Sequence, residues 1–309
     1  MSIQELLKSF DKFLITTHKG IDGDAVGSCL AMGHFLSSRG KDVLLFFQDP
    51  FPQKYLPLLG SLKIVPDVSP EASGSALICL DTSDLERAEI RELSNFAHVV
   101  NIDHHPTNTN FGSWNVVHTE YSSTGEILAE MLLNEGFSAP KIVWDSLYLA
   151  IYADTNGFQF QNTRPQTLKI AAEVLSRGSG PEISSLFFSL SEEELRILAR
   201  ALDNMIFEPP IAYSVLHHTL NLPEGFDSDY IMNIWKNWRE PKVYLLFKEI
   251  HPKFFKVSMR ANPGIDLTRV AVQFDGGGHA AAAGCTVHGD WEEARRKLTE
   301  AIRNDILRS

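Results

Sequence analysis

Cysteine is scarce in this chain of 309 residues, where it occurs only as Cys29, Cys79 and Cys285. No two of the three form the C-x-x-C pair that many zinc and redox sites use. Three widely spaced cysteines also cannot supply the disulfide framework of a small secreted domain. We therefore expect packed, reduced thiols in a cytoplasmic protein.

Long hydrophobic runs are absent as well. No run approaches the roughly 20 apolar residues that cross a bilayer, and residues 1–13 lack the basic start and apolar stretch of a secretory signal. Hydrophobic residues make up 44% of the chain and charged residues 22%, which is ordinary for soluble globular proteins. The sequence predicts a soluble protein with no membrane partner and with room for two domains.

Positive charge is in deficit: 28 Lys and Arg residues stand against 39 Asp and Glu residues, for a formal net charge of -11. Proteins that grip long nucleic acid normally present a basic surface that displaces counterions from the phosphates. The deficit therefore argues against long duplex nucleic acid as a partner. It is compatible with a small phosphorylated ligand held by metal ions, because the carboxylates that bind such ions are included among the Asp and Glu residues, whereas the charge of the ions is not.

Short apolar runs alternate with amphipathic stretches in the first half of the chain. The runs show no polar alternation, which is typical of strands buried on both faces of a parallel sheet. Strands that alternate with helices predict an α/β domain with a doubly wound, mostly parallel sheet. The predicted strands cover residues 13–17, 43–47, 76–80 and 99–102, and the predicted helices cover residues 25–38, 123–134 and 142–152.

The second half begins with a largely helical stretch over residues 164–208, in which Ser191 and Glu194 form a plausible capping box and Pro209-Pro210 ends the last helix. Strands then follow at 211–217, 243–250 and 254–259, and a helix at 291–306. Three residues separate the last two strands, which predicts a hairpin and hence a smaller α/β domain with a mixed sheet. We place the domains at residues 1–185 and 211–309, joined by a helical linker over 186–210.

Acidic and imidazole side chains follow several of the predicted strands of the first domain. The carboxyl ends of parallel strands meet at one edge of an open α/β sheet, where ligands bind. Each residue alone has a plainer interpretation, because an Asp after a strand is usually a turn former or helix cap. The joint pattern favours a site made of His18, Asp22, Asp24, Asp81, Asp103, His104, His105 and Asp154.

Carboxylates and imidazoles that converge at one edge repel one another unless cations lie between them. Oxygen and imidazole ligands suit divalent manganese or magnesium better than a thiolate-loving ion. Two such ions roughly 3.5–4 Å apart can share a bridging hydroxide and stabilise an in-line displacement at phosphorus. We assign the other histidines to packing or solvent: His34, His98, His118, His217, His218, His251 and His288.

Five motifs together resemble the DHH phosphoesterase superfamily and its associated DHHA1 domain. They are H-K-G-I-D-G-D from His18, D-T-S-D from Asp81 with Arg87 shortly after, D-H-H-P-T-N from Asp103, A-D-T-N-G-F around Asp154, and G-G-G-H-A-A-A-A-G from Gly276. Their order and the chain's size are most similar to the bacterial nano-RNase and 3′-phosphoadenosine 5′-phosphate phosphatase group. Ile21 and Asn156 depart from the usual motifs, but every apparent ligand position is filled.

The resemblance implies a role for each residue of the first domain. One metal ion would be held by His18, Asp22 and Asp81, and a second by Asp24, Asp81, His104 and Asp154. The catalytic residues would be Asp81 as the bridging ligand, Asp103 as the carboxylate that orients an imidazole, and His105. His105 would contact the scissile phosphate or help protonate the leaving oxygen. Manganese is the expected metal, with magnesium or cobalt as alternatives.

The glycine run of the second domain exposes backbone N–H groups and lets an anion approach closely. A flexible turn before small-residue packing is the plainer interpretation, but the motifs of the first domain favour ligand recognition. Arginine would add bidentate contact with a phosphate. The predicted substrate-binding residues are Arg87, Ser258, Arg260, Gly277, Gly278 and His279.

These features predict a dinuclear-metal phosphoesterase that hydrolyses short single-stranded oligoribonucleotides to mononucleotides, 3′-phosphoadenosine 5′-phosphate to AMP, or both. Alternatives are a cyclic-dinucleotide phosphodiesterase, a single-strand exonuclease and an inorganic pyrophosphatase or polyphosphatase; the glycine run counts against a pyrophosphatase. In a different class, a catalytically silent nucleotide-binding module would have lost a metal ligand, and no loss is visible. Apolar faces could also support a homodimer.

Overall fold

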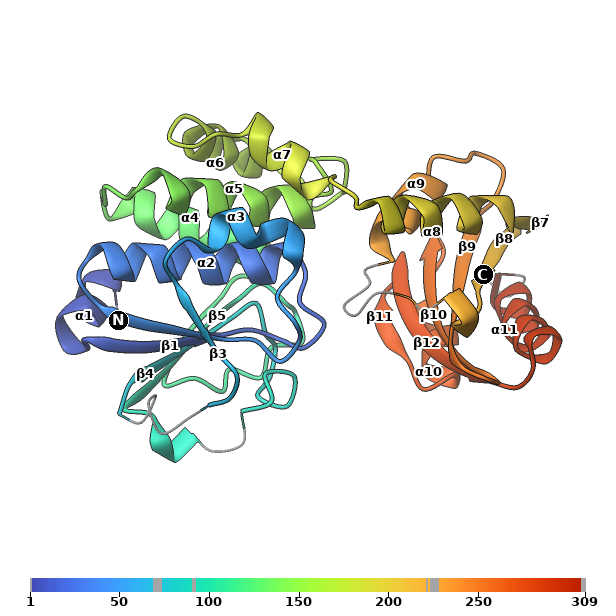
Figure 1. The fold of residues 1–309 in the computed structure, drawn as a ribbon, viewed down its shortest axis with the longest axis horizontal. Coiled ribbons are helices and arrows are strands. Elements are labelled where there is room, and N and C mark those ends of the chain that lie inside the picture. The colour runs from blue at the N-terminus through green and yellow to red at the C-terminus, as the bar shows by residue number, and fades with distance from the viewer. Residues whose placement is uncertain (1, 69–73, 91–92, 221, 223–227, 307–309) are drawn as a thin grey trace. The chain divides into compact units, whose positions relative to one another are not determined.

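The computed structural model describes residues 2–68, 74–90, 93–220, 222 and 228–306. The chain divides into two compact units, Met1–Ser189 and Leu190–Ser309. Figure 1 shows an α/β arrangement in each. In the part of the chain that is described, no helix is both long and apolar enough to cross a membrane.

The first unit contains a six-stranded sheet in the order β3-β2-β1-β4-β5-β6, and every pair is parallel. The direction of strand order reverses between β1 and β4, so the switch point of the sheet lies between these two strands. Residues of β4 are buried throughout, as the unbroken apolar run predicts. The strands are β1 (Lys12–Thr16), β2 (Asp42–Phe46), β3 (Lys63–Val65), β4 (Ala76–Leu80), β5 (His98–Asp103) and β6 (Trp114–Val117).

Helices gather on one face of this sheet, where α2 lies next to the strands, α5 packs against α2 with α4 beside it, and α6 and α7 lie farthest from the sheet (Figure 1). The opposite face packs against the connection between β4 and β5, through residues such as Ala88, Ile90 and Phe96. The helices of the unit are α1 (Ile3–Ser9), α2 (Gly23–Ser38), α3 (Leu56–Leu59), α4 (Thr124–Asn134), α5 (Lys141–Asp154), α6 (Pro165–Leu175) and α7 (Pro181–Phe187).

Small residues let α2, α4 and α5 approach one another closely. A Cβ atom on Gly27 of α2 would lie 2.5 Å from the carbonyl oxygen of Ser146 on α5. A Cβ atom on Gly125 of α4 would lie 2.3 Å from Cβ of Ala150, also on α5. This packing brings the N-termini of α2 and α4 next to the C-terminus of α5, so the helix ends converge near the carboxyl edge of the sheet.

Gly27→Val is expected to lower the free energy of unfolding by about 3 kcal/mol, at the upper end of overpacking costs. The added side chain would meet the backbone of α5 at Ser146 and Ala150, which cannot move without displacing the helix. Denaturant unfolding measures the change. Ser37→Val, at an exposed position of the same helix, should cost less than about 1 kcal/mol. Equal losses in the two variants would contradict the close-packing account.

The second unit contains a mixed sheet in the order β11-β12-β10-β9-β8-β7, in which β8 and β9 pair in parallel and the other pairs are antiparallel. One face packs against α10 and α11 and the other against α8 and α9. The elements are α8 (Glu192–Asp203), β7 (Ile206–Glu208), β8 (Ile211–Leu216), α9 (Asp229–Trp235), β9 (Val243–His251), β10 (Phe254–Ala261), α10 (Thr268–Gln273), β11 (Gly277–His279), β12 (Ala282–His288) and α11 (Trp291–Ile306).

The predicted linker over residues 186–210 is divided in the structure. The boundary between the units falls after Ser189, and α8 buries Ile197 and Ala201 against the sheet of the second unit. Ser191 does cap α8, and Glu194 completes the capping box. The helix therefore contributes to the core of the second unit.

Candidate metal centre

The predicted site residues of the first unit lie at the carboxyl edge of its sheet, around the switch point. His18 follows β1 and Asp81 follows β4, the two strands that flank this point. Asp103 ends β5, and His104 and His105 come next. Asp22 caps α2, Asp24 lies in the first turn of that helix, and Asp154 ends α5. The close approach of the three helices thus supplies ligands that the strands alone do not.

A first group of donors comprises His18, Asp22 and Asp81, whose ligand atoms all lie within 4.8 Å of one another. Nε2 of His18 is 3.4 Å from Oδ2 of Asp81 and 3.9 Å from Oδ2 of Asp22. Nδ1 of His18 lies 2.9 Å from the carbonyl oxygen of Lys19. Because a carbonyl only accepts, Nδ1 carries the proton in this contact and Nε2 is left to bind a cation.

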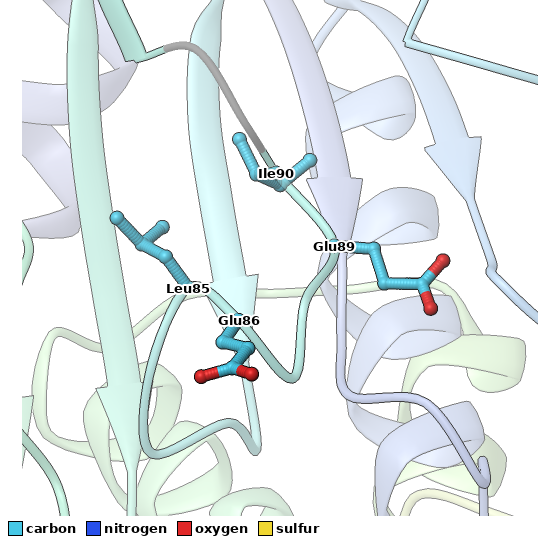
Figure 2. Close-up of a pocket in the computed structure, with 4 residues that line it drawn as sticks. All are labelled: Leu85, Glu86, Glu89 and Ile90. Carbon is cyan, nitrogen blue, oxygen red and sulfur yellow. The ribbon is translucent and has the colours of Figure 1, made fainter.

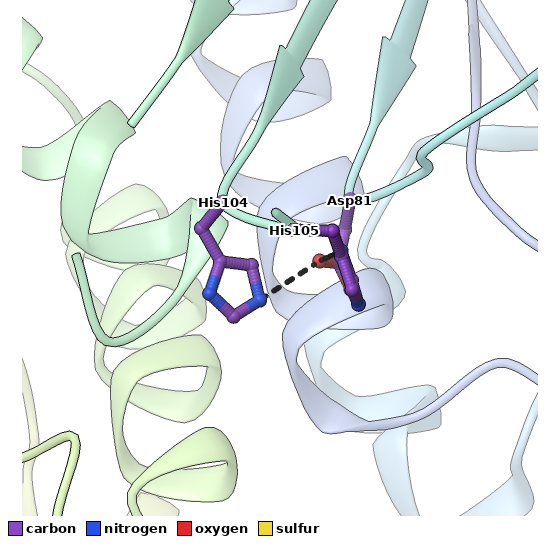
Figure 3. A group of neighbouring side chains, drawn as sticks. All are labelled: Asp81, His104 and His105. Carbon is purple, nitrogen blue, oxygen red and sulfur yellow. Dashed lines mark ion pairs between the residues drawn. The ribbon is translucent and has the colours of Figure 1, made fainter. Parts of the chain in front are cut away.

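A second group comprises Asp24, His104 and Asp154. Nε2 of His104 is 3.9 Å from Oδ2 of Asp24 and 3.7 Å from Oδ2 of Asp154. The same nitrogen is 3.5 Å from Oδ1 of Asp81, the contact drawn in Figure 3. Asp81 therefore presents one oxygen to His18 and the other to His104, which is the position that a ligand shared by two cations would occupy.

A third group comprises Asp81, His104 and His105. Nδ1 of His105 is 3.7 Å from Oδ1 of Asp81 but only 2.7 Å from Oδ1 of Asp103. Asp103 is fully buried, and its other oxygen accepts a 2.6 Å hydrogen bond from Nδ2 of Asn108. The nearer contact fixes Nδ1 of His105 on Asp103.

The backbone of Asp81 is itself unusual, because its φ of 54° lies in the left-handed region. Its N–H group donates to the carbonyl oxygen of Ile102 at 3.0 Å, which extends the pairing of β4 and β5 by one residue. Its side chain is buried, with 1% of the residue exposed. The turn after β4 thus places this carboxylate at the centre of the three donor groups.

Burial and mutual repulsion disfavour the charged forms of several carboxylates at this site. Burial, reinforced by the charges of Asp81 and Asp154, raises the pKa of Asp24 well above its ordinary value. Burial also raises the pKa of Asp154 to about 7, with His104 opposing the shift and Asp22 and Asp81 reinforcing it. Protons therefore compensate the repulsion in the absence of another cation.

The pKa values of Asp81 and His18 shift in opposite directions. Burial alone would raise the pKa of Asp81, but the hydrogen bond from His18 and the charges of the neighbouring histidines hold it well below its ordinary value. Burial opposes a charge on His18, yet its hydrogen bond to Asp81 and the charges of Asp22 and Asp81 raise its pKa to about 9. A divalent cation can take the place of these protons, and the oxygen and imidazole donors fit a hard to borderline ion.

The sequence did not point to several residues that hold these ligands. Thr124 donates its N–H to Oδ2 of Asp24 at 2.7 Å and its hydroxyl to Oδ1 of Asp81 at 3.2 Å. Gly125 and Ser28 both donate to Oδ1 of Asp24, at 3.0 and 2.9 Å. The start of a helix at residue 123 was the available signal, because helix N-termini present unpaired N–H groups to carboxylates.

Arg87, a predicted substrate-binding residue of the first unit, is exposed. The N–H of Arg87 donates to Oδ1 of Asp84 at 2.8 Å. Its positive charge also acts on His105 and lowers the pKa of that imidazole, against the larger effects that raise it. A cavity of about 350 Å³ lies in the same segment, lined by Leu85, Glu86, Glu89 and Ile90 (Figure 2). None of the predicted metal ligands lines it.

The other predicted substrate-binding residues lie in the second unit on two strands, β10 and β11, which both pair with β12. Ser258 and Arg260 occupy alternate positions of β10, and Nη1 of Arg260 donates to the carbonyl oxygen of Met259. Gly277 and Gly278 pair with β12, and Gly278 has a φ of 133°, which favours glycine. The backbone of His279 ends β11, but its side chain is outside the part that the structure describes.

Two family models match the chain: the DHH family, N-terminal domain, over residues 12–151, and the DHHA1 domain over residues 215–306. The chain therefore contains a DHH-family N-terminal domain and a DHHA1 domain. The predicted site residues up to His105 lie inside the DHH match, and Asp154 lies just beyond it. The DHHA1 match contains the glycine run and Arg260.

Similar proteins cover nearly the whole of this DHH/DHHA1 chain. The bifunctional oligoribonuclease and PAP phosphatase NrnA of Thermus thermophilus is 29% identical over 99% of this chain and 94% of that protein. The NrnA of Bacillus subtilis is 27% identical over 94% of each. The crystal structure of an exopolyphosphatase-related protein from Bacteroides fragilis has a TM-score of 0.89 and 26% identity, over 98% of this chain and 94% of that one.

Proposed function

We propose that this protein is a metal-dependent phosphoesterase that hydrolyses short oligoribonucleotides to mononucleotides, 3′-phosphoadenosine 5′-phosphate to AMP, or both. The observation that carries the proposal is the convergence of three donor groups at the switch point of a parallel sheet, where the third group shares Asp81 with the first and His104 with the second. The similarity to two NrnA proteins over nearly their full length supports the substrate class.

The donor groups divide into two candidate metal positions. His18, Asp22 and Asp81 would hold one ion, and Asp24, Asp81, His104 and Asp154 the other. When bound, two divalent ions would polarise a phosphoryl oxygen and supply a water of lowered pKa. We propose manganese as the preferred metal, with magnesium and cobalt as alternatives, since the donors are oxygen and imidazole.

His105 is proposed to act on the substrate. Its Nδ1 is held by Asp103 at 2.7 Å, so its Nε2 remains available to contact the scissile phosphate or to carry a proton to the leaving oxygen. Asn108 holds Asp103 from the other side, which fixes the carboxylate and hence the plane of the ring. Asp103 thus positions His105.

The DHHA1 unit is proposed to bind the nucleotide as well, with Arg260, Ser258 and the glycine run as its contacts. A guanidinium group suits bidentate contact with a phosphate. The backbone at Gly277 is open to close approach because a Cβ atom there would meet nothing within 4 Å, whereas a Cβ atom on Gly278 would lie 2.6 Å from the carbonyl oxygen of Ala282. His279 is proposed to contribute from the same run.

Turnover is expected to fall steeply with substrate length. A 5′-phosphorylated dinucleotide should be hydrolysed at least tenfold faster than a 24-mer RNA, because the chain has a formal charge of -11 and offers little attraction to a long polyanion. Mononucleotide release is measured for both substrates at equal concentration of scissile bonds. Comparable rates would contradict the proposed substrate class.

The experiment that tests the proposal measures phosphate and mononucleotide release from 3′-phosphoadenosine 5′-phosphate and from a 5′-phosphorylated dinucleotide. Each is run with manganese, with magnesium and after chelation. Release that needs the metal supports the proposal, and the ratio of the two rates separates phosphatase from nano-RNase activity. Tripolyphosphate is included because one similar solved structure is that of an exopolyphosphatase-related protein. Release from tripolyphosphate alone would overturn the nucleotide assignment.

A further inference from the structure

One turn of the first unit contacts several predicted metal ligands although it contains none of them. We call residues 121–125 the ligand turn. Thr124 and Gly125 donate their backbone N–H groups to the two oxygens of Asp24, at 2.7 and 3.0 Å. The hydroxyl of Thr124 donates to Oδ1 of Asp81 at 3.2 Å. The ligand turn therefore fixes the carboxylates of both proposed metal positions.

The same turn also contacts the remaining ligands of the second group. Nδ1 of His104 faces the carbonyl oxygen of Tyr121 at 3.4 Å. Nδ2 of Asn162 donates at 3.1 Å to the carbonyl oxygens of both Ser122 and Asp154. The ligand turn is thus connected to His104 directly and to Asp154 through one amide group.

The carboxylate of Glu126 holds the ligand turn through hydrogen bonds. Its side chain is fully buried in the first turn of α4. Oε2 accepts hydrogen bonds from the N–H of Ser122 at 2.8 Å and from the hydroxyl of Thr167 at 3.0 Å. Oε1 accepts from Nη2 of Arg164 at 2.9 Å. A buried carboxylate with three donors holds its partners in one arrangement, because any loss leaves a buried polar group unpaired.

Arg164 also contacts the ligand turn directly, through the ring of Tyr121. Its guanidinium carbon lies 4.8 Å from the ring centroid of Tyr121, within the range of a cation–π contact. Arg164 also precedes α6, and Thr167 lies in its first turn. The pair of Glu126 and Arg164 therefore ties the ligand turn to α6 as well as to α4.

We propose that Glu126 is a positioning residue of the metal centre. Through Ser122 it holds the ligand turn at the distance that keeps Asp24 and Asp81 in place for the two cations, and it touches neither metal nor substrate. This inference rests on the proposed metal-dependent function. Residues that orient metal ligands from behind typically change metal affinity by about 10–100-fold when they are replaced.

Glu126→Gln tests the proposal because the shape is kept while one accepting oxygen becomes an N–H donor. That donor would face either the N–H of Ser122 or the guanidinium of Arg164. Manganese affinity, measured by titration calorimetry without substrate, is expected to fall about tenfold or more. The electron paramagnetic resonance spectrum of bound manganese should change, and excess manganese should restore much of the turnover.

Asp145→Asn is the matched control. Asp145 is also a buried carboxylate of this unit, and it accepts hydrogen bonds from the N–H and hydroxyl of Ser179. It lies nine residues before Asp154 on α5, roughly 13 Å along the helix axis. This variant should lose stability but keep the manganese affinity and spectrum of the wild type.

Equal manganese affinities in Glu126→Gln and the wild type, or equal losses in Glu126→Gln and Asp145→Asn, would overturn the proposal. If Glu126→Gln does not fold, Thr167→Val removes a single donor to the same oxygen. It should lower manganese affinity about threefold, and an unchanged affinity would again overturn the proposal. A wild-type chain that binds manganese but hydrolyses no substrate would contradict the proposed function and leave this inference intact. A wild-type chain that binds no manganese would overturn both.

Discussion

Asp81→Asn is expected to lower kcat by about a thousandfold or more, which corresponds to roughly 4 kcal/mol of lost transition-state stabilisation. The carboxylate of Asp81 lies 3.4 Å from His18 through one oxygen and 3.5 Å from His104 through the other. A neutral amide presents one weak oxygen donor in place of two charged ones, so both proposed metal positions lose a ligand. Steady-state release of mononucleotide in saturating manganese measures the effect.

Asp42→Asn is the control for this substitution, because Asp42 is an exposed residue at the start of β2. It should retain the wild-type rate and the wild-type unfolding midpoint. Asp81→Asn should also remain folded, because asparagine keeps the size and shape of the side chain and tolerates the left-handed φ of 54° at this position. A folded Asp81→Asn protein with wild-type turnover would exclude Asp81 as a shared metal ligand.

His105→Asn is expected to lower kcat by about 10²–10⁴-fold, the range of a lost acid or phosphate-contacting group, while manganese binding stays at the wild-type level. Manganese binding should be unchanged because Nδ1 of His105 is directed to Asp103, at 2.7 Å, and lies 3.7 Å from Asp81. Metal titration and turnover are measured on the same preparation. Asp103→Asn should lower kcat in the same direction, because Asp103 accepts hydrogen bonds from His105 and Asn108 through its two oxygens, and an amide can accept through only one.

A loss of one manganese equivalent in His105→Asn would contradict this role. His105 would then be a metal ligand, as its place in the third donor group also allows. The phosphate contact would have to be assigned to another residue, and Arg87 is a candidate because its charge acts on His105.

The sequence predicted the central strands well because burial on both faces leaves a simple signal. Strand β4 is an unbroken apolar run and β1 and β5 contain shorter apolar runs, and in each case a polar residue of the site lies at the end of the strand or soon after it. The edge strands β3 and β6 gave no such signal, since their side chains are only partly buried. The pairing of short exposed strands depends on neighbours that are distant in the sequence.

Helix α8 shows a second limit of the sequence. Its capping box and amphipathic pattern predicted a helix at this position, and the helix is there. An apolar stripe does not reveal which core it covers, however, and α8 covers the sheet of the second unit rather than forming a linker.

Some residues of the site could also be predicted from the sequence, and others could not. Side chains that follow strands could be predicted to converge, because parallel strands end at one edge. Asp154 ends a helix, and its approach depends on the contact of α4 and α5 at Gly125 and Ala150, which no local pattern encodes. Thr124 acts largely through a backbone N–H, which every residue except proline has.

The most direct test of the metal centre counts the manganese ions bound by the wild-type chain. Equilibrium binding combined with low-temperature electron paramagnetic resonance gives both their number and their magnetic coupling. We expect two ions per chain, coupled to each other because Asp81 presents its two oxygens to both donor groups. A single ion, or two ions without coupling, would contradict a centre in which Asp81 is shared.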